Sequence, residues 1–353
     1  MQQSMPSIVS EAEADPFLMC DEFGPTPSRK AYGNDTDDGF DVAWHPHHGM
    51  DILSYMVEGN GRHADSMGNR ETFASPGFQW MSVGSGIEHA EGGGTPAGHN
   101  THGFQIWLRM PKDKMKDDPR YGTVQPADIP TVPLADGGVV RVIAGPHGEV
   151  VGPAQFAVTV QILDVELKPN EEFAYSRPDG IDNVMFYGFK GAATLNGSDL
   201  IRAQQICRFD TQTGNAALLR AGGAGFRAMV FAGKQTKEKL VWHGPFVCAS
   251  KQQLYVHVAG TCRTRTHPPL SPCTRVLCRL SLSLPHTICL RLLVAGVNRW
   301  AELQCNRKFA TLQDGVLPTV PTRAVPSSPS PMGLQGCNQN PKGPSIAHKV
   351  TRE

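Results

Sequence analysis

Apolar residues recur at every second position through much of residues 15–245 of this chain. The clearest run covers 158–168, in which Leu163, Val165 and Leu167 alternate with Asp164, Glu166 and Lys168. Residues 104–108 and 226–232 repeat the pattern. Side chains two positions apart share one face of a strand, so these runs predict strands with one buried face and one solvent-facing face.

Turn-forming residues separate the predicted strands, at Gly59-Asn60-Gly61, Gly68-Asn69 and Asn196-Gly197. The chain is rich in such residues, with 37 Gly and 28 Pro among 353 residues. A short helix is predicted at 112–116, and helical periodicity is scarce elsewhere. Many short strands with regular turns predict an all-β barrel or sandwich.

Two segments of the chain resemble one another. Residues 44–59 align with residues 176–191 without a gap, at an offset of 132 residues. The identical pairs are Pro46 with Pro178, Tyr55 with Tyr187, and Gly59 with Gly191. The apolar alternation of the two segments also agrees. Two copies of one β-barrel unit would explain this internal repeat.

Charge is distributed unevenly, although 33 basic and 33 acidic residues give a net charge of zero. Residues 251–353 hold 13 Lys or Arg and three Asp or Glu, a net +10, which leaves −10 for residues 1–250. The acidic part has no evident surface for nucleic acid, and we expect no direct nucleic-acid binding from it. Six of the nine cysteines also lie in residues 251–353. The other three are too scattered for a disulfide framework.

The sequence offers no candidate for a membrane span. No window approaches about 18 uncharged apolar residues, the length that a spanning helix needs. The N-terminus carries Glu11, Glu13 and Asp15 where a secretory signal would have a basic start and an apolar run. We therefore expect a cytoplasmic or nuclear protein that contacts no membrane and is not secreted.

Two short motifs bring together side chains that bind metals, His45-Pro46-His47 and His89-Ala90-Glu91. Residues i and i+2 of a strand point to the same side, and Pro46 favours extended backbone at the residue before it. If the two strands face a common point, they present three imidazoles and one carboxylate. This ligand set suits Fe(II), Mn(II), Ni(II), Cu(II) or Zn(II), and leaves open positions on an electrophilic ion.

The spacing alone is also compatible with surface histidines, and both interpretations remain open at this point. His48 should point away from His47, which predicts a surface or supporting role. His63, His99 and His102 have no histidine two positions away, and we expect structural or supporting roles for them.

At these motifs the chain resembles the pirin family, whose members are bicupins. The resemblance covers about residues 12–248. The matching stretches are Asp15-Pro-Phe-Leu-Met-Cys-Asp-Glu-Phe-Gly24, His45-Pro-His-His-Gly49, Tyr55-Met-Val-Glu-Gly59, 62–70, Pro76-Gly77, Gln79-Trp80-Met81, Gly84-Ser-Gly-Ile-Glu-His-Ala-Glu91 and His102-Gly-Phe-Gln-Ile-Trp107, with looser matches at 142–145 and 243–247.

The resemblance implies two tandem cupin barrels, with metal only in the first. The implied domains are an N-terminal metal-binding cupin at 1–137 and a C-terminal cupin without metal ligands at 138–248. The implied ligands are His45, His47, His89 and Glu91. Fe(II) is the usual metal, and Mn, Ni, Co, Cu or Zn are alternatives. The sequence agrees about the second barrel, because Arg177 and Asp179 take the places of His45 and His47 in the repeat.

The family implies two functions that share one set of ligands. Some members resemble quercetin 2,3-dioxygenase and open flavonols with dioxygen. The metal then binds the flavonol 3-oxygen and Glu91 is the base that takes its proton. Other members are nuclear, iron-dependent co-regulators that sense redox state and bind a transcription factor. The acidic main body favours the oxygenase.

Two departures from the family are expected. Residues 1–14 do not match it, and the chain leaves the pattern after Val247, where the family continues into a closing helix. Residues 249–353 are low in complexity, with 11 prolines in residues 251–353. We expect either disorder or sequence from an incorrect splice, and the basic charge could alternatively contact phosphate.

Overall fold

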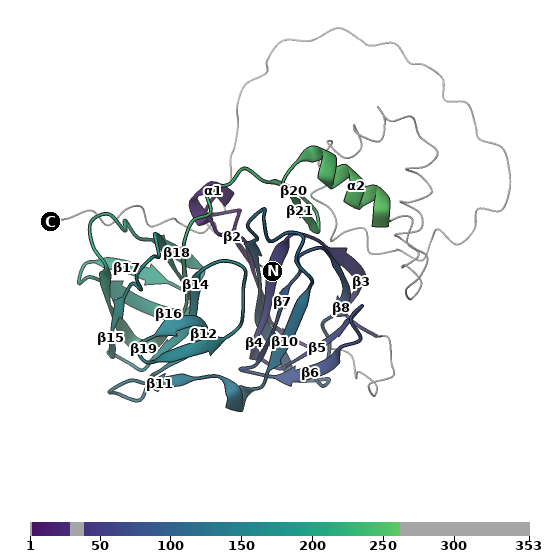
Figure 1. The fold of residues 1–353 in the computed structure, drawn as a ribbon. Coiled ribbons are helices and arrows are strands. Elements are labelled where there is room, and N and C mark those ends of the chain that lie inside the picture. The colour runs from purple at the N-terminus through teal and green to yellow at the C-terminus, as the bar shows by residue number, and fades with distance from the viewer. Residues whose placement is uncertain (1, 29–38, 262–353) are drawn as a thin grey trace, which may run out of the picture. The chain divides into compact units, whose positions relative to one another are not determined.

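Residues 2–28 and 39–261 are described by the computed structural model, and they form two β-barrels followed by a hairpin and a helix (Figure 1). The predictions for residues 262–353 lie outside the described residues. Strands dominate both barrels, so the all-β prediction and the two tandem cupin barrels are confirmed. Among the described residues, no helix is long and apolar enough to cross a membrane.

The first barrel is built from two sheets. A six-stranded antiparallel sheet has the order β1-β2-β9-β4-β7-β10, and a four-stranded sheet has the order β3-β8-β5-β6. The strands are β1 (Gln2–Met5), β2 (Phe17–Pro27), β3 (Val42–His47), β4 (Met50–Glu58), β5 (Asn60–Asp65), β6 (Arg70–Ala74), β7 (Phe78–Ser82), β8 (Ile87–Glu91), β9 (Asn100–Arg109) and β10 (Arg120–Val124). The turns predicted at Gly68-Asn69 and Asn196-Gly197 fall between consecutive strands, whereas of Gly59-Asn60-Gly61 only Gly59 lies between β4 and β5.

The second barrel is a nine-stranded sheet with the central order β11-β12-β14-β19-β16-β17. A short 3-10 helix, η1 (Pro126–Asp128), precedes it. Its strands are β11 (Thr131–Pro133), β12 (Val139–His147), β13 (Val150–Pro153), β14 (Val160–Leu167), β15 (Glu172–Ser176), β16 (Asn183–Leu195), β17 (Asp199–Arg202), β18 (Gln205–Arg208) and β19 (Ala216–Gly233). The inner face of this barrel is apolar, because Val140, Leu163, Phe186, Phe226 and Val230 pack in one buried cluster.

The remaining elements are α1 (Glu11–Ala14), the hairpin of β20 (Val241–His243) and β21 (Phe246–Cys248), and α2 (Lys251–Thr261). Helix α1 begins with a capping box, in which Ser10 and Glu13 exchange side-chain and backbone hydrogen bonds. The prediction of disorder is wrong for residues 251–261, which are helical. The predicted helix at 112–116 is also wrong. That segment forms successive turns, in which the Lys114 amide donates to Pro111 and the Asp117 amide donates to Lys114.

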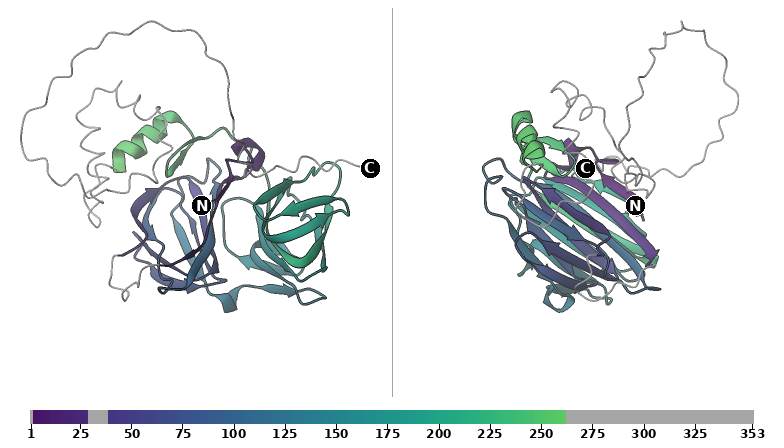
Figure 2. Two further views of the ribbon diagram at one scale, coloured as in Figure 1. Left: turned by 180° about the vertical axis from the view of Figure 1, so that it is seen from behind. Right: turned by 90° about the vertical axis from the view of Figure 1, so that its right-hand side faces the viewer.

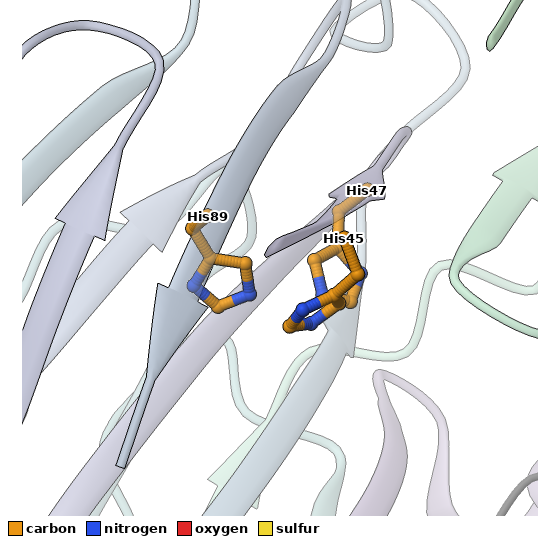
Figure 3. Close-up of side chains that lie close together, drawn as sticks. All are labelled: His45, His47 and His89. Carbon is orange, nitrogen blue, oxygen red and sulfur yellow. The ribbon is translucent and has the colours of Figure 1, made fainter. Parts of the chain in front are cut away.

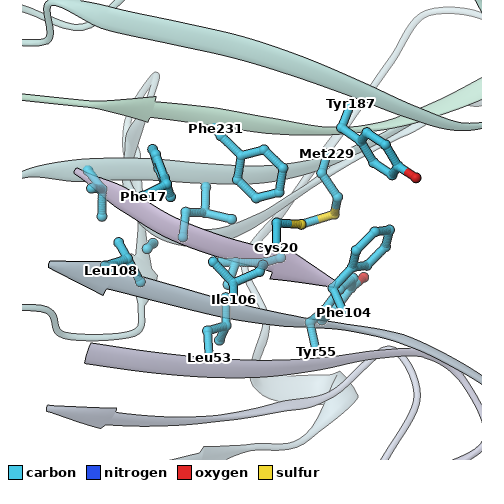
Figure 4. Packing of buried hydrophobic residues seen from close by; sticks show 14 of the residues in the cluster. Phe17, Cys20, Leu53, Tyr55, Phe104, Ile106, Leu108, Tyr187, Met229 and Phe231 are labelled. Carbon is cyan, nitrogen blue, oxygen red and sulfur yellow. The ribbon is translucent and has the colours of Figure 1, made fainter. Parts of the chain in front are cut away.

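The six-stranded sheet of the first barrel packs against β14, β16 and β19 of the second. Leu53, Phe104 and Ile106 of the first barrel belong to one buried cluster with Met229 and Phe231 of the second (Figure 4). Figure 2 shows the two barrels from two further sides. The strands predicted at 104–108 and 226–232 are confirmed, but the expected solvent-facing side is wrong, since one face of each strand lies in this interface and the other faces the interior of its own barrel.

The prediction that Asp164 of β14 faces solvent is wrong, because its side chain is fully buried in the interface between the barrels. Its carboxylate accepts hydrogen bonds from Tyr55 Oη at 2.5 Å, Arg227 Nη2 at 2.6 Å and Arg141 Nη1 at 3.1 Å. Burial alone would raise the pKa of Asp164, but the bonds and charges of the two arginines hold that pKa below its ordinary value. The alternation of one strand cannot reveal that a second barrel covers its polar face.

A corresponding contact runs in the opposite direction across the interface. Tyr187 of the second barrel donates its hydroxyl to Glu22 Oε2 at 2.6 Å, and His102 Nε2 lies 2.8 Å from Glu22 Oε1. Tyr55 and Tyr187 coincide in the internal repeat. They also occupy corresponding strands, because the sheet order β2-β9-β4 in the first barrel matches β14-β19-β16 in the second. The repeat in the sequence therefore corresponds to two barrels that pack through equivalent sheets.

Candidate metal centre

Strands β3 and β8 are antiparallel neighbours, and this pairing brings the two histidine motifs together. His45 lies directly opposite His89 in the register, and Pro46 lies opposite Glu88. The register shifts between Val42 and His45, so the strand is irregular just before the motif. Figure 3 shows His45, His47 and His89 with their rings turned toward a common point. The sequence prediction that these three imidazoles converge is met by the geometry.

The three histidines form a close cluster. One ring nitrogen from each lies within 4.8 Å of the others. The ring centroids of His45 and His89 are 4.3 Å apart, and those of His47 and His89 are 5.0 Å apart. His47 and His89 are buried, whereas His45 is half-buried. The cluster is therefore enclosed by the barrel and can be reached on the side of His45.

The hydrogen bonding of the cluster fits a divalent metal. Neither ring nitrogen of His47 or His89 has a hydrogen-bond partner within the described part of the chain, although both side chains are buried. His45 donates Nδ1–H to the carbonyl of Ala43 at 2.8 Å, which leaves Nε2 available to a metal. Burial, reinforced by the neighbouring imidazoles, holds the pKa of His47 and His89 well below 6.5. Neutral imidazoles with unused nitrogens are suitable metal ligands.

Glu91 is not a member of the close histidine cluster. Its Oε2 accepts hydrogen bonds from Ser54 Oγ at 3.0 Å and from Gln79 Nε2 at 2.8 Å. Its Oε1 accepts one from Gln105 Nε2 at 2.9 Å. These three donors belong to β4, β7 and β9 of the opposing sheet. The carboxylate of Glu91 thus reaches across the barrel interior from the strand that carries His89.

The three donors form a row across adjacent strands, because Ser54 lies opposite Gln79 in one register and opposite Gln105 in the other. These residues were not expected to be functional from the sequence. The available signal was that each is a polar residue between two apolar neighbours in a strand. Without the strand pairing, however, nothing indicates that the three side chains meet one carboxylate.

The remaining histidines of the first barrel have other partners. His63 is buried, its Nε2 lies 3.1 Å from Asp65 Oδ2, and its ring stacks on Tyr121. His102 pairs with Glu22 in the barrel interface, and His99 is exposed. The expectation of a surface role for His48 is wrong, because its side chain is buried and its Nδ1 lies 2.8 Å from the carbonyl oxygen of Val247. The hairpin of β20 and β21 covers His48, although it lies far from His48 in the sequence.

An aromatic wall adjoins the cluster. The ring of Trp107 meets His47 edge-on, with centroids 5.2 Å apart, and Trp242 of the C-terminal hairpin packs against Trp107. Val247 joins the buried cluster at the same end of the barrel, which includes Met50 and Ile87. The hairpin of β20 and β21 therefore contributes to the surroundings of the first barrel's site.

Fold and site together define a bicupin with a histidine cluster in its first barrel. The profile of the family described as Pirin matches residues 1–108. The profile described as Pirin C-terminal cupin domain matches residues 162–259. The chain belongs to the pirin family.

The relatives agree with this assignment. The chain is 32% identical over 249 residues to a Pseudomonas aeruginosa protein named "Putative quercetin 2,3-dioxygenase", covering 68% of this chain and 82% of that protein. It is also 32% identical over 246 residues to a "Pirin-like protein" of Caulobacter vibrioides, covering 68% and 83% of the two chains.

Solved structures show the same fold. The crystal structure of quercetin 2,3-dioxygenase from Acinetobacter baumannii has a TM-score of 0.64 and 22% identity, covering 72% of this chain and 88% of that chain. A Geobacillus kaustophilus protein has a TM-score of 0.54 and 24% identity, covering 65% and 88% of the two chains.

The family matches correct both expected departures. The first match begins at residue 1, and β1 pairs with β2 as an edge strand of the first barrel. The second match extends to residue 259 and includes most of α2. The chain therefore continues the family pattern beyond Val247.

Proposed function

We propose that this protein is a mononuclear metal-dependent dioxygenase that opens flavonols such as quercetin. Its metal would be one divalent ion, with Fe(II) as the first choice, held by His45, His47 and His89 with Glu91 as the fourth ligand or as the base. The observation that carries the proposal is the enclosed histidine cluster, in which buried ring nitrogens have no partner among the described residues. The names of the relatives support the choice of substrate.

The chain's own residues supply binding and proton transfer. A bound redox-active ion would act as a Lewis acid toward the flavonol 3-oxygen and support its reaction with dioxygen. In this proposal the carboxylate of Glu91 takes the proton of the flavonol 3-hydroxyl. Ser54, Gln79 and Gln105 fix the orientation of Glu91 through neutral hydrogen bonds. The adjacent ring of Trp107 makes the surroundings of His47 partly aromatic, which suits an aromatic substrate.

Glu91→Gln tests the role of the carboxylate. The control is Glu88→Gln, on the same strand but on the opposite face, since Glu88 and Glu91 are an odd number of positions apart. Loss of a general base lowers turnover by about 10²–10⁴-fold. Elemental analysis of both purified variants then separates the two roles. Retained metal with lost turnover identifies a base, whereas lost metal identifies a ligand.

The assay follows the loss of quercetin's visible absorbance together with oxygen uptake, for protein loaded with Fe, Mn, Ni, Co or Cu. Turnover should require metal and should disappear in His47→Ala. Protein that binds metal at the histidine cluster but consumes no oxygen with any of these ions would contradict the dioxygenase proposal. That outcome would favour the family's other function, an iron-dependent contact with a transcription factor, for which Fe(II) and Fe(III) forms should differ in partner affinity.

A further inference from the structure

A second group of metal-binding side chains lies outside the histidine cluster of the first barrel. It consists of His48, Cys248 and His257, and one nitrogen or sulfur atom from each lies within 4.8 Å of the others. His48 and Cys248 are buried and His257 is half-buried. We propose that these residues form a second metal site, of the zinc class, which fastens the C-terminal helix to the rim of the first barrel.

The orientation of His48 supports coordination. Its Nδ1 lies 2.8 Å from the carbonyl oxygen of Val247, so that the N–H at this position donates to a backbone acceptor. Metal-binding histidines typically make this bond with the nitrogen that does not contact the metal, and it leaves Nε2 as the ligand atom. Backbone bonds also fix the segment, because the His48 amide donates to Pro245 and the Val247 amide donates to His48.

The two other side chains approach the same imidazole. Cys248 Sγ lies beside this ring, 3.7 Å from Nδ1, which is the nitrogen that also faces Val247 and not the proposed ligand atom Nε2. The rings of His48 and His257 have centroids 3.7 Å apart and planes inclined by 33°. One donor atom from each of the three residues lies within 4.8 Å of the others, a separation that a shared cation can bridge.

The ligand types select the metal. Two imidazoles and one thiolate are the N and S donors that Zn(II) prefers, and a solvent molecule can complete four-coordination. Hard cations such as Mg(II) and Ca(II) prefer oxygen donors and are not expected here. Zinc binding would displace the Cys248 thiol proton to solvent and form a zinc–sulfur bond without oxidation or reduction.

The three ligands come from separate elements, which gives the site a structural purpose. His48 follows β3, Cys248 ends β21 and His257 lies in α2, above the first barrel (Figure 1). Helix α2 has 11 residues, and helices of this length are marginal in water without tertiary contacts. Tyr255 and Val256 in this helix remain exposed. A shared metal would link the helix, the hairpin and the barrel rim.

Cobalt substitution tests the site in the full-length protein. A thiolate bound to Co(II) gives an intense near-ultraviolet charge-transfer band, which the all-histidine cluster of the first barrel cannot produce. Replacing either the sulfur in Cys248→Ser or an imidazole in His257→Gln should remove one equivalent of bound Co(II), and Cys248→Ser should also remove the band. Cys207→Ser is the matched control, since Cys207 is likewise a buried free cysteine but lies in the second barrel.

Two results would overturn the proposal. A thiolate band of equal intensity in the parent and in Cys248→Ser would place the metal on other cysteines. Absence of any thiolate band in the parent would show that no site exists. Hydrogen exchange of α2 provides a second measurement, in which Zn(II) should slow exchange in the parent and leave it unchanged in His257→Gln. None of these readouts depends on quercetin turnover, so the dioxygenase proposal can fail independently.

Discussion

Asp51→Asn should stabilise the protein in neutral solution and lose most of this advantage in acid. Asp51 is fully buried, and its Oδ2 accepts a hydrogen bond from the Ala157 amide at 2.6 Å. Its Oδ1 has no hydrogen-bond partner in the described part of the chain. Burial raises the pKa of Asp51 from 3.8 to about 7, because bonds from Ala157 and Ser82 and the charge of Arg120 offset only part of the desolvation.

The sign of the effect follows from which state holds the proton more tightly. A raised pKa in the folded state means that folding favours the protonated carboxyl. Stability is therefore greatest in acid, falls as the pH rises from 3.8 to about 7, and is constant above that range. Each pKa unit corresponds to about 1.4 kcal/mol, so ionised Asp51 costs about 4 kcal/mol at high pH.

Urea unfolding of parent and variant at about pH 5 and about pH 8 measures the effect. The free energy of unfolding of Asp51→Asn minus that of the parent should be about 3 kcal/mol larger at the higher pH than at the lower pH. Comparing the two differences cancels any fixed change in the bond to Ala157. Asp128→Asn, at an exposed carboxylate, controls for net charge. An equal difference between parent and Asp51→Asn at both pH values would refute the argument that burial perturbs this carboxyl.

Three further substitutions or additions have expected outcomes. Asp164→Asn should lower the free energy of unfolding by about 3–5 kcal/mol in urea titrations, because the charge of Arg227 stays buried without its partner. Gly61→Ala should cost about 1–3 kcal/mol in the same assay, since the added Cβ would lie 2.3 Å from the ring of Phe73. Excess Ni(II) should raise the midpoint of thermal unfolding, because it would bind the folded state, and a chelator should reverse this rise. The rise should be smaller for His89→Ala.

The strands were the most predictable part of the structure, because alternation is a local property. The runs at 104–108 and 226–232 were assigned correctly, and the side chains of each run divide between two faces as expected. The surroundings of those faces were not predictable. Asp164 lies on the polar side of its strand, and that side is buried by a neighbouring barrel which no local pattern reveals.

The candidate site was predicted in part for a similar reason. His45, His47 and His89 belong to two motifs whose i, i+2 spacing already fixes a shared face, and one strand pairing brings them together. The position of Glu91 depends instead on three residues of the opposite sheet, and its hydrogen bonds could not be inferred from its own motif. Of the two roles expected for His48, the surface role was wrong, because the segment that buries it follows about 200 residues later in the chain.

The internal repeat allows the two barrels to be compared at equivalent positions. In the interface the equivalent residues Tyr55 and Tyr187 make equivalent contacts. Each donates a hydroxyl hydrogen bond to a carboxylate of the opposite barrel. Inside the barrels the two copies differ. The first contains a row of polar residues facing Glu91, whereas Leu163, Phe186 and the other inward residues of the second pack as an apolar core.

This division has a physical basis. A buried polar site costs stability unless its groups are paired, and the unpaired nitrogens of the histidine cluster are such a cost in the absence of a ligand. An apolar second barrel contributes burial without that cost, and because residues of both barrels pack in one buried cluster, we expect it to stabilise the first barrel. Disrupting the interface at Tyr187 should therefore weaken metal binding in the first barrel, although Tyr187 contacts none of the histidines in the cluster. Titration of the Tyr187→Phe protein with Ni(II) would measure this coupling, and an unchanged affinity together with a lowered stability would show that the two barrels are energetically separate.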